Sequence, residues 1–376
     1  HSMIRQKSKK KNRYKIHCVN YHMRSIVLPI AIVLILVSSC TENRKKYSPS
    51  FIAVANGEMP AITSENSNSL HMVFGKGDSI LYTNLDKAGN SFAPPVLVDT
   101  LHDLVAYATR GPQISATKNG LVIIAVNKAG NIYSYLKDAT GNWTKTGKVN
   151  DVDTTDKEGF LGLSGDGGNN LFAIWPDLRK DKHNKLFGAR STDGGKTWNK
   201  NILVYASPDG NICECCKPSV VMQGQHVMVM FRNWLRGNRN LYLIQSIDGG
   251  ESFGKATKLG IGSWTLDGCP MDGGGLAVSK EGTIQTAWRR KSTIYACEPG
   301  QPEKDLGEGK NCTVETVNHQ NIYAWTNKGN ITCLLPGGSQ KVIGKGMLPV
   351  LKSLNDKEVI CVWENDKQIE AYILHL

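Results

Sequence analysis

The feature that most constrains the fold of this chain is an eight-residue turn motif that occurs twice. It reads Ser-Thr-Asp-Gly-Gly-Lys-Thr-Trp at residues 191–198 and Ser-Ile-Asp-Gly-Gly-Glu-Ser-Phe at residues 246–253. Weaker copies lie at residues 84–92 and 137–143. In such a turn the Asp can accept hydrogen bonds from backbone N–H groups, and Gly tolerates a positive φ. The motif therefore predicts a β-hairpin that is repeated along the chain.

Short apolar runs separated by Gly, Asn and Asp turns extend this repeat over residues 51–376, and they are typical of an all-β protein. The first strand of each unit is expected to begin near Pro60, Pro112, Phe160, Pro218, Gly273 and Pro349. These positions are roughly 50 residues apart, with one longer interval before the last, and four-stranded units of that length are propeller blades. We therefore expect a single domain that is a six-bladed β-propeller with four-stranded antiparallel blades. Residues 51–55 could supply the outer strand of the last blade and so leave no free sheet edge.

The two strong motifs resemble the Asp-box, or bacterial neuraminidase repeat, of the sialidase superfamily. The resemblance extends from about residue 50 to the end of the chain. In that family the box folds the outer hairpin of a blade and lies away from the active site. The motif therefore implies a sialidase-like fold and does not by itself imply an activity.

The segment before the repeats is expected to be a removable leader. Arg24 precedes an apolar run at residues 26–37, and Ser38, Ser39 and Cys40 follow. A basic residue before a short apolar run is typical of a signal peptide, and a membrane-spanning helix needs about 20 apolar residues. Residues 37–40 resemble a bacterial lipobox, which implies that residues 1–39 are removed and that Cys40 carries a lipid. Residues 40–50 would then be a linker, and the protein would be anchored in the cell envelope and face the periplasm or the cell exterior. A buried core helix or an uncleaved anchor is the alternative.

The charge of the chain depends on this leader. Residues 1–39 hold eight Lys and Arg and no acidic residue, which leaves +4 of the net charge of +12 for the rest of the chain. A strongly basic protein would suggest nucleic acid as a partner, but this excess lies mainly in the part that is expected to be removed. We therefore expect a monomeric propeller that binds no nucleic acid.

Propeller topology predicts where chemistry could occur. Loops between the second and third strands share one face with the connections between blades, so residues from distant units meet there. The candidate ligand-binding residues on that face are Arg110, Arg232, Arg289, Arg290 and Asp272. Because an Arg fork matches a carboxylate, these residues favour a glycan or another small anionic ligand. For each Arg taken singly, a salt bridge at the surface or between blades is the alternative.

The resemblance to sialidases also implies catalytic candidates. Those enzymes hold the substrate carboxylate with three Arg, use an Asp as acid/base and attack with a Tyr that a Glu activates, which departs from the two-carboxylate scheme. Asp177 is the candidate acid and Tyr295 the candidate nucleophile, but no Glu in the sequence pairs clearly with Tyr295. Glu364, at the end of a second strand, is the third catalytic candidate. The match is partial, because Arg110 lies in Thr-Arg-Gly-Pro and not in the Arg-Ile-Pro of the family. Two functions stay open: a propeller that binds and hydrolyses a glycan, and a non-catalytic binding or scaffolding propeller.

Four cysteines are expected to meet at the mouth of the channel. Cys213, Cys215 and Cys216 precede the fourth unit and Cys269 precedes the fifth, at equivalent connections. The segment resembles a subgroup of exported Asp-box proteins with Cys-x-Cys-Cys-x-Pro and a later Gly-Cys-Pro. The thiols could form disulfides, which exported proteins favour, or could bind copper or zinc. No other cofactor is expected.

The other cysteines and a glycine run complete the expectations. Cys297 and Cys312 flank an apparent insertion in the fifth unit and are expected to close it as a pair, whereas Cys333 and Cys361 are expected to be buried free thiols. Residues 272–275 read Asp-Gly-Gly-Gly and predict a tight approach of the backbone. They do not predict a phosphate site, because no helix follows them.

Overall fold

A computed structural model describes residues 51–65, 69–86, 88, 90–179 and 181–376. The expected leader and the expected lipid site, Cys40, lie outside the described residues, so both stay predictions. Within the described residues the secondary structure is β-sheet apart from the short 3₁₀ helix η1 (Pro336–Gly338). No helix in these residues has the length and apolar content for crossing a bilayer.

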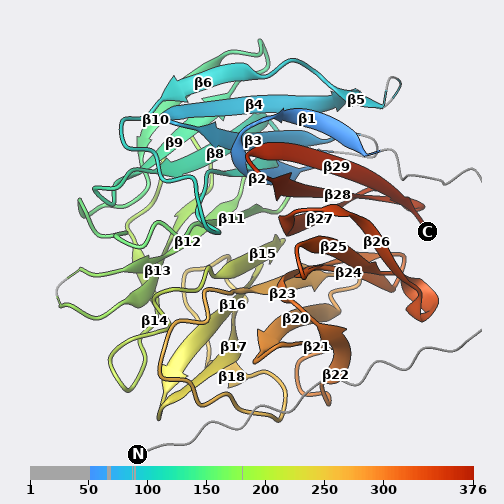
Figure 1. Ribbon diagram of the computed structural model, residues 1–376. Helices are drawn as coiled ribbons and strands as arrows, with labels where there is room; N and C mark the ends of the chain where they lie inside the picture. Colours follow the sequence, from blue (N-terminus) through green and yellow to red (C-terminus); the bar gives the residue numbers. More distant parts are fainter. Residues whose placement is uncertain (1–50, 66–68, 87, 89, 180) are drawn as a thin grey trace, which may run out of the picture. The chain divides into compact units, whose positions relative to one another are not determined.

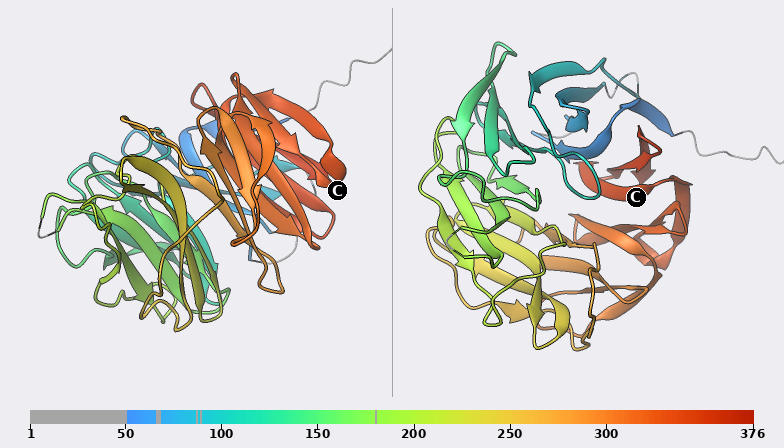
Figure 2. Two further views of the ribbon diagram at one scale, coloured as in Figure 1. Left: turned by 90° about the horizontal axis from the view of Figure 1, so that it is seen from below. Right: turned by 60° about the vertical axis from the view of Figure 1, so that its left-hand side comes forward.

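The strands form seven antiparallel sheets that lie around a common centre, as the right-hand view of Figure 2 shows. The innermost strands contact one another in sequence, and the last contacts the first, so the ring is closed. The inner strands, which apart from β7 and β19 are labelled in Figure 1, are β2 (Glu58–Thr63), β7 (Gln113–Thr117), β11 (Gly162–Gly165), β15 (Ser219–Gln223), β19 (Gly274–Val278), β23 (Lys310–Val317) and β27 (Met347–Asn355).

Each inner strand is followed outward by antiparallel partners. In blades one to three these are β3 (His71–Lys76), β4 (Ser79–Asp86), β5 (Ser91–Phe92) and β6 (Val96–Thr100), then β8 (Gly120–Val126), β9 (Ile132–Lys137) and β10 (Trp143–Lys148), then β12 (Leu171–Asp177), β13 (Lys185–Ser191) and β14 (Ile202–Tyr205).

Blades four to seven follow the same order. Their outer strands are β16 (His226–Leu235), β17 (Asn238–Ser246) and β18 (Thr257–Lys258), then β20 (Ile284–Arg290), β21 (Thr293–Cys297) and β22 (Lys304–Glu308), then β24 (Gln320–Asn327), β25 (Asn330–Leu334) and β26 (Gln340–Lys345), then β28 (Glu358–Asn365), β29 (Gln368–His375) and β1 (Ile52–Asn56).

The all-β propeller with four-stranded blades agrees with the prediction, but the predicted number of six blades is wrong. All six predicted first strands begin within three residues of the expected position. The missed blade comprises β23 to β26 and lies in the long interval before β27. That interval contains two blades with short turns, and neither carries an Asp-box, so their repeat had no marker in the sequence.

The closing strand was predicted correctly. β1 pairs antiparallel with β29, with Ile52 opposite Ala371 and Asn56 opposite Gln368. The last blade is therefore built from both ends of the described chain. This pairing covers the outer edge of β29, which would otherwise present unpaired backbone groups.

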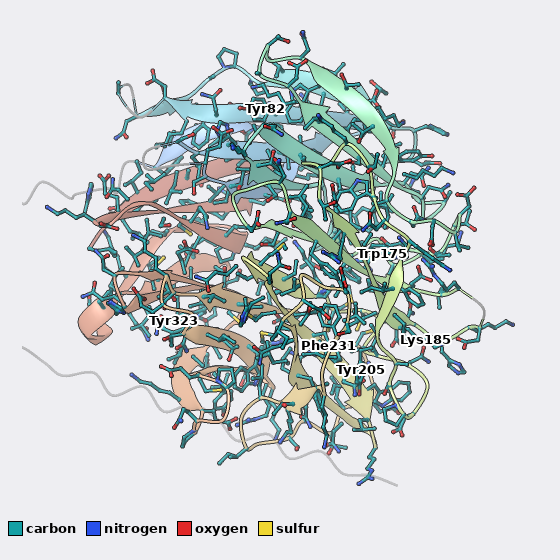
Figure 3. All side chains as sticks on the ribbon, turned by 180° about the vertical axis from the view of Figure 1, so that it is seen from behind. Tyr82, Trp175, Lys185, Tyr205, Phe231 and Tyr323 are labelled. Atoms are coloured by element: carbon teal, nitrogen blue, oxygen red, sulfur yellow. The ribbon has the colours of Figure 1, made fainter. Side chains whose placement is uncertain are left out.

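The core consists of seven apolar clusters, one between each pair of neighbouring blades. Because both faces of a blade are covered, a middle strand is apolar on both sides, and every residue of β12 is buried. Trp175 of β12 packs in the cluster between blades two and three, while Tyr205 lies against Phe231 between blades three and four, with ring centroids 4.7 Å apart (Figure 3). Burial of this kind is the main stabilising contribution to such a ring.

The Asp-box hairpins adopt the expected structure. The Asp193 carboxylate accepts hydrogen bonds from the backbone N–H of Thr197 at 3.0 Å and from its hydroxyl at 2.6 Å. Gly194 and Gly195 have φ of 75° and 85°. The box joins β13 to β14 at the outer side of the blade, so it shapes the hairpin and leaves the centre of the ring to other residues.

Candidate functional site: the central cavity and the thiol cluster

The blade-joining face holds a cavity of about 260 Å³ at the centre of the ring. Every blade contributes to its wall through the start of its inner strand or the connection before it. A second cavity of about 370 Å³ lies toward the other ends of the same strands. Propeller topology thus brings residues more than 200 positions apart to one site, as Met59 of the first blade and Leu348 of the seventh illustrate.

Lys217 supplies the positive charge in the wall of the first cavity. Its ammonium group donates a hydrogen bond to Gln113 Oε1 at 3.0 Å. The Gln113 amide nitrogen in turn donates to the carbonyl oxygens of Gly111 and Pro112, and this holds its oxygen toward Lys217. Surrounding protein removes water from the amine and lowers the pKa of Lys217 to about 8. The amine is therefore mainly protonated at neutral pH.

Asp272 is the carboxylate of the same wall, and its charge has partners. Arg289 Nε lies 2.9 Å from Asp272 Oδ2, and the backbone N–H of Asn311 donates to the same oxygen at 3.0 Å. Burial raises the pKa of Asp272, although the Asn311 hydrogen bond and the Arg289 charge oppose that change. The cavity is therefore positive, because its carboxylate is neutralised and its ammonium group is not.

The glycine run after Asp272 lets blade five approach both of its neighbours closely. A Cβ atom on Gly273 would lie 2.4 Å from the Lys217 carbonyl oxygen, and one on Gly275 would lie 2.7 Å from the backbone nitrogen of Val314. The predicted tight approach of the backbone is confirmed. It brings Lys217 and Asp272 to neighbouring positions on the cavity wall.

The predicted arginines all have partners inside the protein. Arg232 is buried and donates to the carbonyl oxygens of Asp272, Arg239 and Arg289. Arg289 also donates to the Pro270 carbonyl oxygen. These contacts join blades four and five, which is the inter-blade alternative stated above. Neither guanidinium group lines the central cavity, and a role in ligand binding stays a prediction.

Arg110 and Arg290 also have partners within the protein. Arg110 lies over the Phe160 ring, 4.0 Å from its centroid, and donates to the Glu158 carbonyl oxygen. Arg290 forms an ion pair with Glu303 at 2.6 Å. The four arginines that were expected to bind one ligand are thus engaged in contacts within the protein.

The three catalytic candidates do not come together. Asp177 is fully buried, and its carboxylate accepts hydrogen bonds from the Trp175 indole and from the backbone and side chain of Arg179. Tyr295 lies on the third strand of blade five, beneath Arg290 and stacked on Trp288. Glu364 belongs to blade seven and accepts a hydrogen bond from the Met59 backbone at 3.1 Å. The Tyr–Glu pair that the resemblance implies is therefore not formed, since blade six separates these two residues.

The thiol cluster is formed as predicted. Cys213, Cys215 and Cys216 are buried together, and their sulfur atoms lie within 4.8 Å of one another. Cys269, which is exposed, reaches Cys215 from the next blade connection. The predicted disulfides are not present, because the Sγ–Sγ distances from Cys213 to Cys215 and Cys216 are 3.7 and 3.4 Å, whereas a disulfide bond measures about 2.05 Å.

The other cysteines are also free thiols in the structure. Cys297 packs in the cluster between blades four and five and Cys312 in the cluster between blades five and six, so the predicted loop-closing pair is wrong. The supposed insertion is the β21–β22 hairpin followed by the start of blade six. Cys333 and Cys361 are fully buried as expected, and they contact each other between blades six and seven.

Sequence reasoning missed Lys217 and Gln113. A signal for Lys217 was available, because it lies between the Cys segment and Pro218 in a blade connection that was already identified. Gln113 had no such signal, since a single Gln at the start of an inner strand is common in any sheet.

Comparisons with known proteins identify the fold and no family. No family model matches the chain, and no curated protein matches it. Among solved structures, a streptogramin B lyase is 11% identical, with 87% of this chain and 97% of that chain covered and a TM-score of 0.53. An α-L-arabinofuranosidase from Fusarium graminearum in complex with an iminosugar inhibitor is 12% identical, with 88% and 98% covered and a TM-score of 0.50.

A microbial sialidase, Hadza Hz136, is also among these structures, at 13% identity, 86% of this chain and 66% of that chain covered, and a TM-score of 0.44. At such identities the likeness shows the β-propeller fold alone.

Proposed function

We propose that this protein is a binding propeller that holds a small anionic ligand, an acidic sugar at the end of a glycan, in the central cavity. The observation that carries the proposal is the Lys217 ammonium group in the cavity wall. Among the described residues it makes no ion pair, and it donates a hydrogen bond to the neutral amide oxygen of Gln113. A cation without a counter-ion in a partly dehydrated cavity favours an anion.

The remaining wall suits a sugar ring. Gln113, Asn311 and Thr313 offer groups that can exchange hydrogen bonds with hydroxyls, and Leu348 with Pro349 offers an apolar surface. The cavity volume of about 260 Å³ lies just below the roughly 300–1,000 Å³ of sites for drug-sized ligands. These dimensions favour one sugar unit over a chain of several.

Binding without hydrolysis is the version that the geometry favours. Glycoside hydrolysis ordinarily needs two carboxyl groups on either side of the scissile bond. Asp272 is the carboxylate in the cavity wall, and Arg289 pairs with it. Asp177 and Tyr295, which the sialidase resemblance would use, lie outside that wall.

The proposed location of the protein comes from its leader sequence. A lipid on Cys40 would anchor the propeller to a membrane of the cell envelope, and the cavity would then meet glycans outside the cytoplasm. Residues 1–50 are not described, so this part rests on the leader sequence alone.

Isothermal titration with a panel of uronic and sialic acids and their neutral analogues tests the proposal. We expect an acidic sugar to bind and Lys217→Met to weaken binding about 10- to 150-fold, since a hydrogen bond to a charged group contributes roughly 1.5–3 kcal/mol. Lys304→Met, at an exposed position of β22, is the matched control and should bind as the wild type does. Equal affinity of the Lys217→Met protein, or no binding by any acid of the panel, would contradict the proposal. Release of aryl alcohol from aryl sialosides by the wild type would overturn the non-catalytic part.

A further inference from the structure

A turn of the backbone forces the three buried thiols together. The Cys216 N–H donates to the Cys213 carbonyl oxygen at 3.3 Å, and the Cys213 N–H donates to the Arg232 carbonyl oxygen at 3.0 Å. The first bond closes a tight turn, which puts the two side chains on the same side of the chain. The second ties that turn to β16. These two hydrogen bonds thus hold the thiol-bearing segment against the blade.

The sulfur spacing matches ligands of one metal ion. Two sulfur ligands at about 2.3 Å from one ion lie roughly 3.8 Å apart in tetrahedral geometry and roughly 4.0 Å apart in trigonal geometry. The observed distances from Cys213 to Cys215 and Cys216 are 3.7 and 3.4 Å. Small shifts of buried side chains would thus place all three sulfurs on one ion, whereas a disulfide would require a sulfur pair to approach by more than an ångström.

Two buried guanidinium groups lie beside the sulfur atoms. Arg239 Nη1 lies 3.1 Å from Cys213 Sγ, and Arg239 is buried. The buried Arg232 adds a second positive charge near the same sulfurs. Three thiolates together with one monovalent cation carry a net charge of −2, which the two guanidinium groups would offset.

Cys269 completes the group from the side of the solvent. It comes from the connection between blades four and five, is exposed, and reaches Cys215 but is not within 4.8 Å of all three buried sulfurs. The cluster therefore has three inner sulfurs and one outer sulfur. Such a set suits an ion that is satisfied by three sulfur ligands better than one that requires four.

We propose that Cys213, Cys215 and Cys216 bind one copper(I) ion, with Cys269 as an exchangeable outer sulfur through which the ion enters and leaves. Soft thiolates select copper(I) and zinc among the common ions, and structural zinc is almost always four-coordinate. On binding, each thiol that is still protonated releases its proton to solvent, three copper–sulfur bonds form, and no electron is transferred. This site is separate from the sugar cavity, and neither proposal depends on the other.

Copper(I) titration of the reduced protein against a chromophoric copper(I) chelator tests the site. We expect one ion per chain and an affinity that falls at least 100-fold in Cys215→Ser. Cys297→Ala, which removes a thiol from another cluster, should bind as the wild type does. X-ray absorption of the loaded protein should show three sulfur neighbours.

The Cys269→Ser variant distinguishes copper(I) from zinc(II) binding. Because the Cys269 side chain is exposed, we expect the variant to fold as the wild type does. We expect this variant to keep copper(I) and to lose zinc(II), since zinc would need the fourth sulfur. Equal loss of both ions would overturn the three-sulfur arrangement. Failure of the wild type to compete for copper(I), or zinc bound in preference to copper(I), would overturn the proposal. If protein isolated without reductant holds no metal and its mass is lower by two hydrogen atoms, a disulfide has formed in place of the metal site.

Discussion

Arg232 gives the sharpest test of whether the arginines join blades or bind a ligand. Its guanidinium group is buried and donates to the carbonyl oxygens of Asp272, Arg239 and Arg289 at 3.2, 2.7 and 2.9 Å. Two of these acceptors belong to blade five or the connection before it, whereas Arg232 belongs to β16 of blade four. Replacement by Met would remove all three hydrogen bonds and keep much of the side-chain volume.

The expected loss of stability follows from these contacts. Each hydrogen bond to a charged group is worth roughly 1.5–3 kcal/mol. The three act on one group and are not additive, and Met regains some apolar burial. We therefore expect Arg232→Met to lower the free energy of unfolding by about 3–5 kcal/mol, as for removal of one partner from a buried charged network.

Guanidinium chloride unfolding, followed by intrinsic tryptophan fluorescence, measures this loss. Arg190→Met is the matched control, because Arg190 pairs with the exposed Glu251, and surface pairs contribute about 0–1 kcal/mol. If the free energy of unfolding of Arg232→Met lies within about 1 kcal/mol of the wild-type value, Arg232 does not hold the two blades together. The sequence-based prediction that Arg232 contacts a ligand would then be favoured.

Two further predictions concern the Asp-box and the glycine run. Asp193→Ala should lower the free energy of unfolding by about 1 kcal/mol at neutral pH, because the turn hydrogen bonds are lost. Burial opposes the shift, but hydrogen bonds from Thr197 and Ser191 lower the pKa of Asp193 in the folded protein. This stabilisation is therefore present above the unfolded pKa of about 3.9 and disappears as the pH falls through the lower folded value, which unfolding at a series of pH values would check. A constant difference down to pH 2 would contradict this account. Gly275→Ala should lower the free energy of unfolding by about 1–3 kcal/mol, because its Cβ would lie 2.7 Å from the Val314 backbone nitrogen. Gly254→Ala is the control and should be nearly neutral in the same denaturation assay, because its Cβ would meet only a carbonyl oxygen at 3.6 Å.

Much of the fold could be predicted because its signals are local. The Asp-box holds its own turn through contacts within five residues, so its residues identify the hairpin wherever they occur. Inner strands begin after Pro or Gly at blade connections, and all six predicted starts were found. Blade six lacked both an Asp-box and long turns, so its strands merged with those of blade five in the sequence pattern.

The site was harder to predict because its contacts cross the ring. Topology placed the candidates on the right face, yet it could not show that Arg232 would satisfy backbone carbonyls or that Asp177 would be enclosed by Arg179. The orientation of each side chain depends on packing between blades, which no single unit encodes. The thiol cluster was the exception, since its members lie at equivalent connections of adjacent blades and had to meet.

Closure of the ring by β1 also imposes an order on folding. Asn56 pairs with Gln368, 312 positions later in the chain, so the first strand of the described chain must wait for nearly the whole polypeptide before its partner is available. Contacts of such separation carry a large loop-closure entropy and are typical of slow folding. Once formed, the same pairing must be broken before blades can separate there, which slows unfolding as well. The lifetime of the folded propeller should therefore depend on the rate at which this one strand detaches, more than on the equilibrium stability of any single blade.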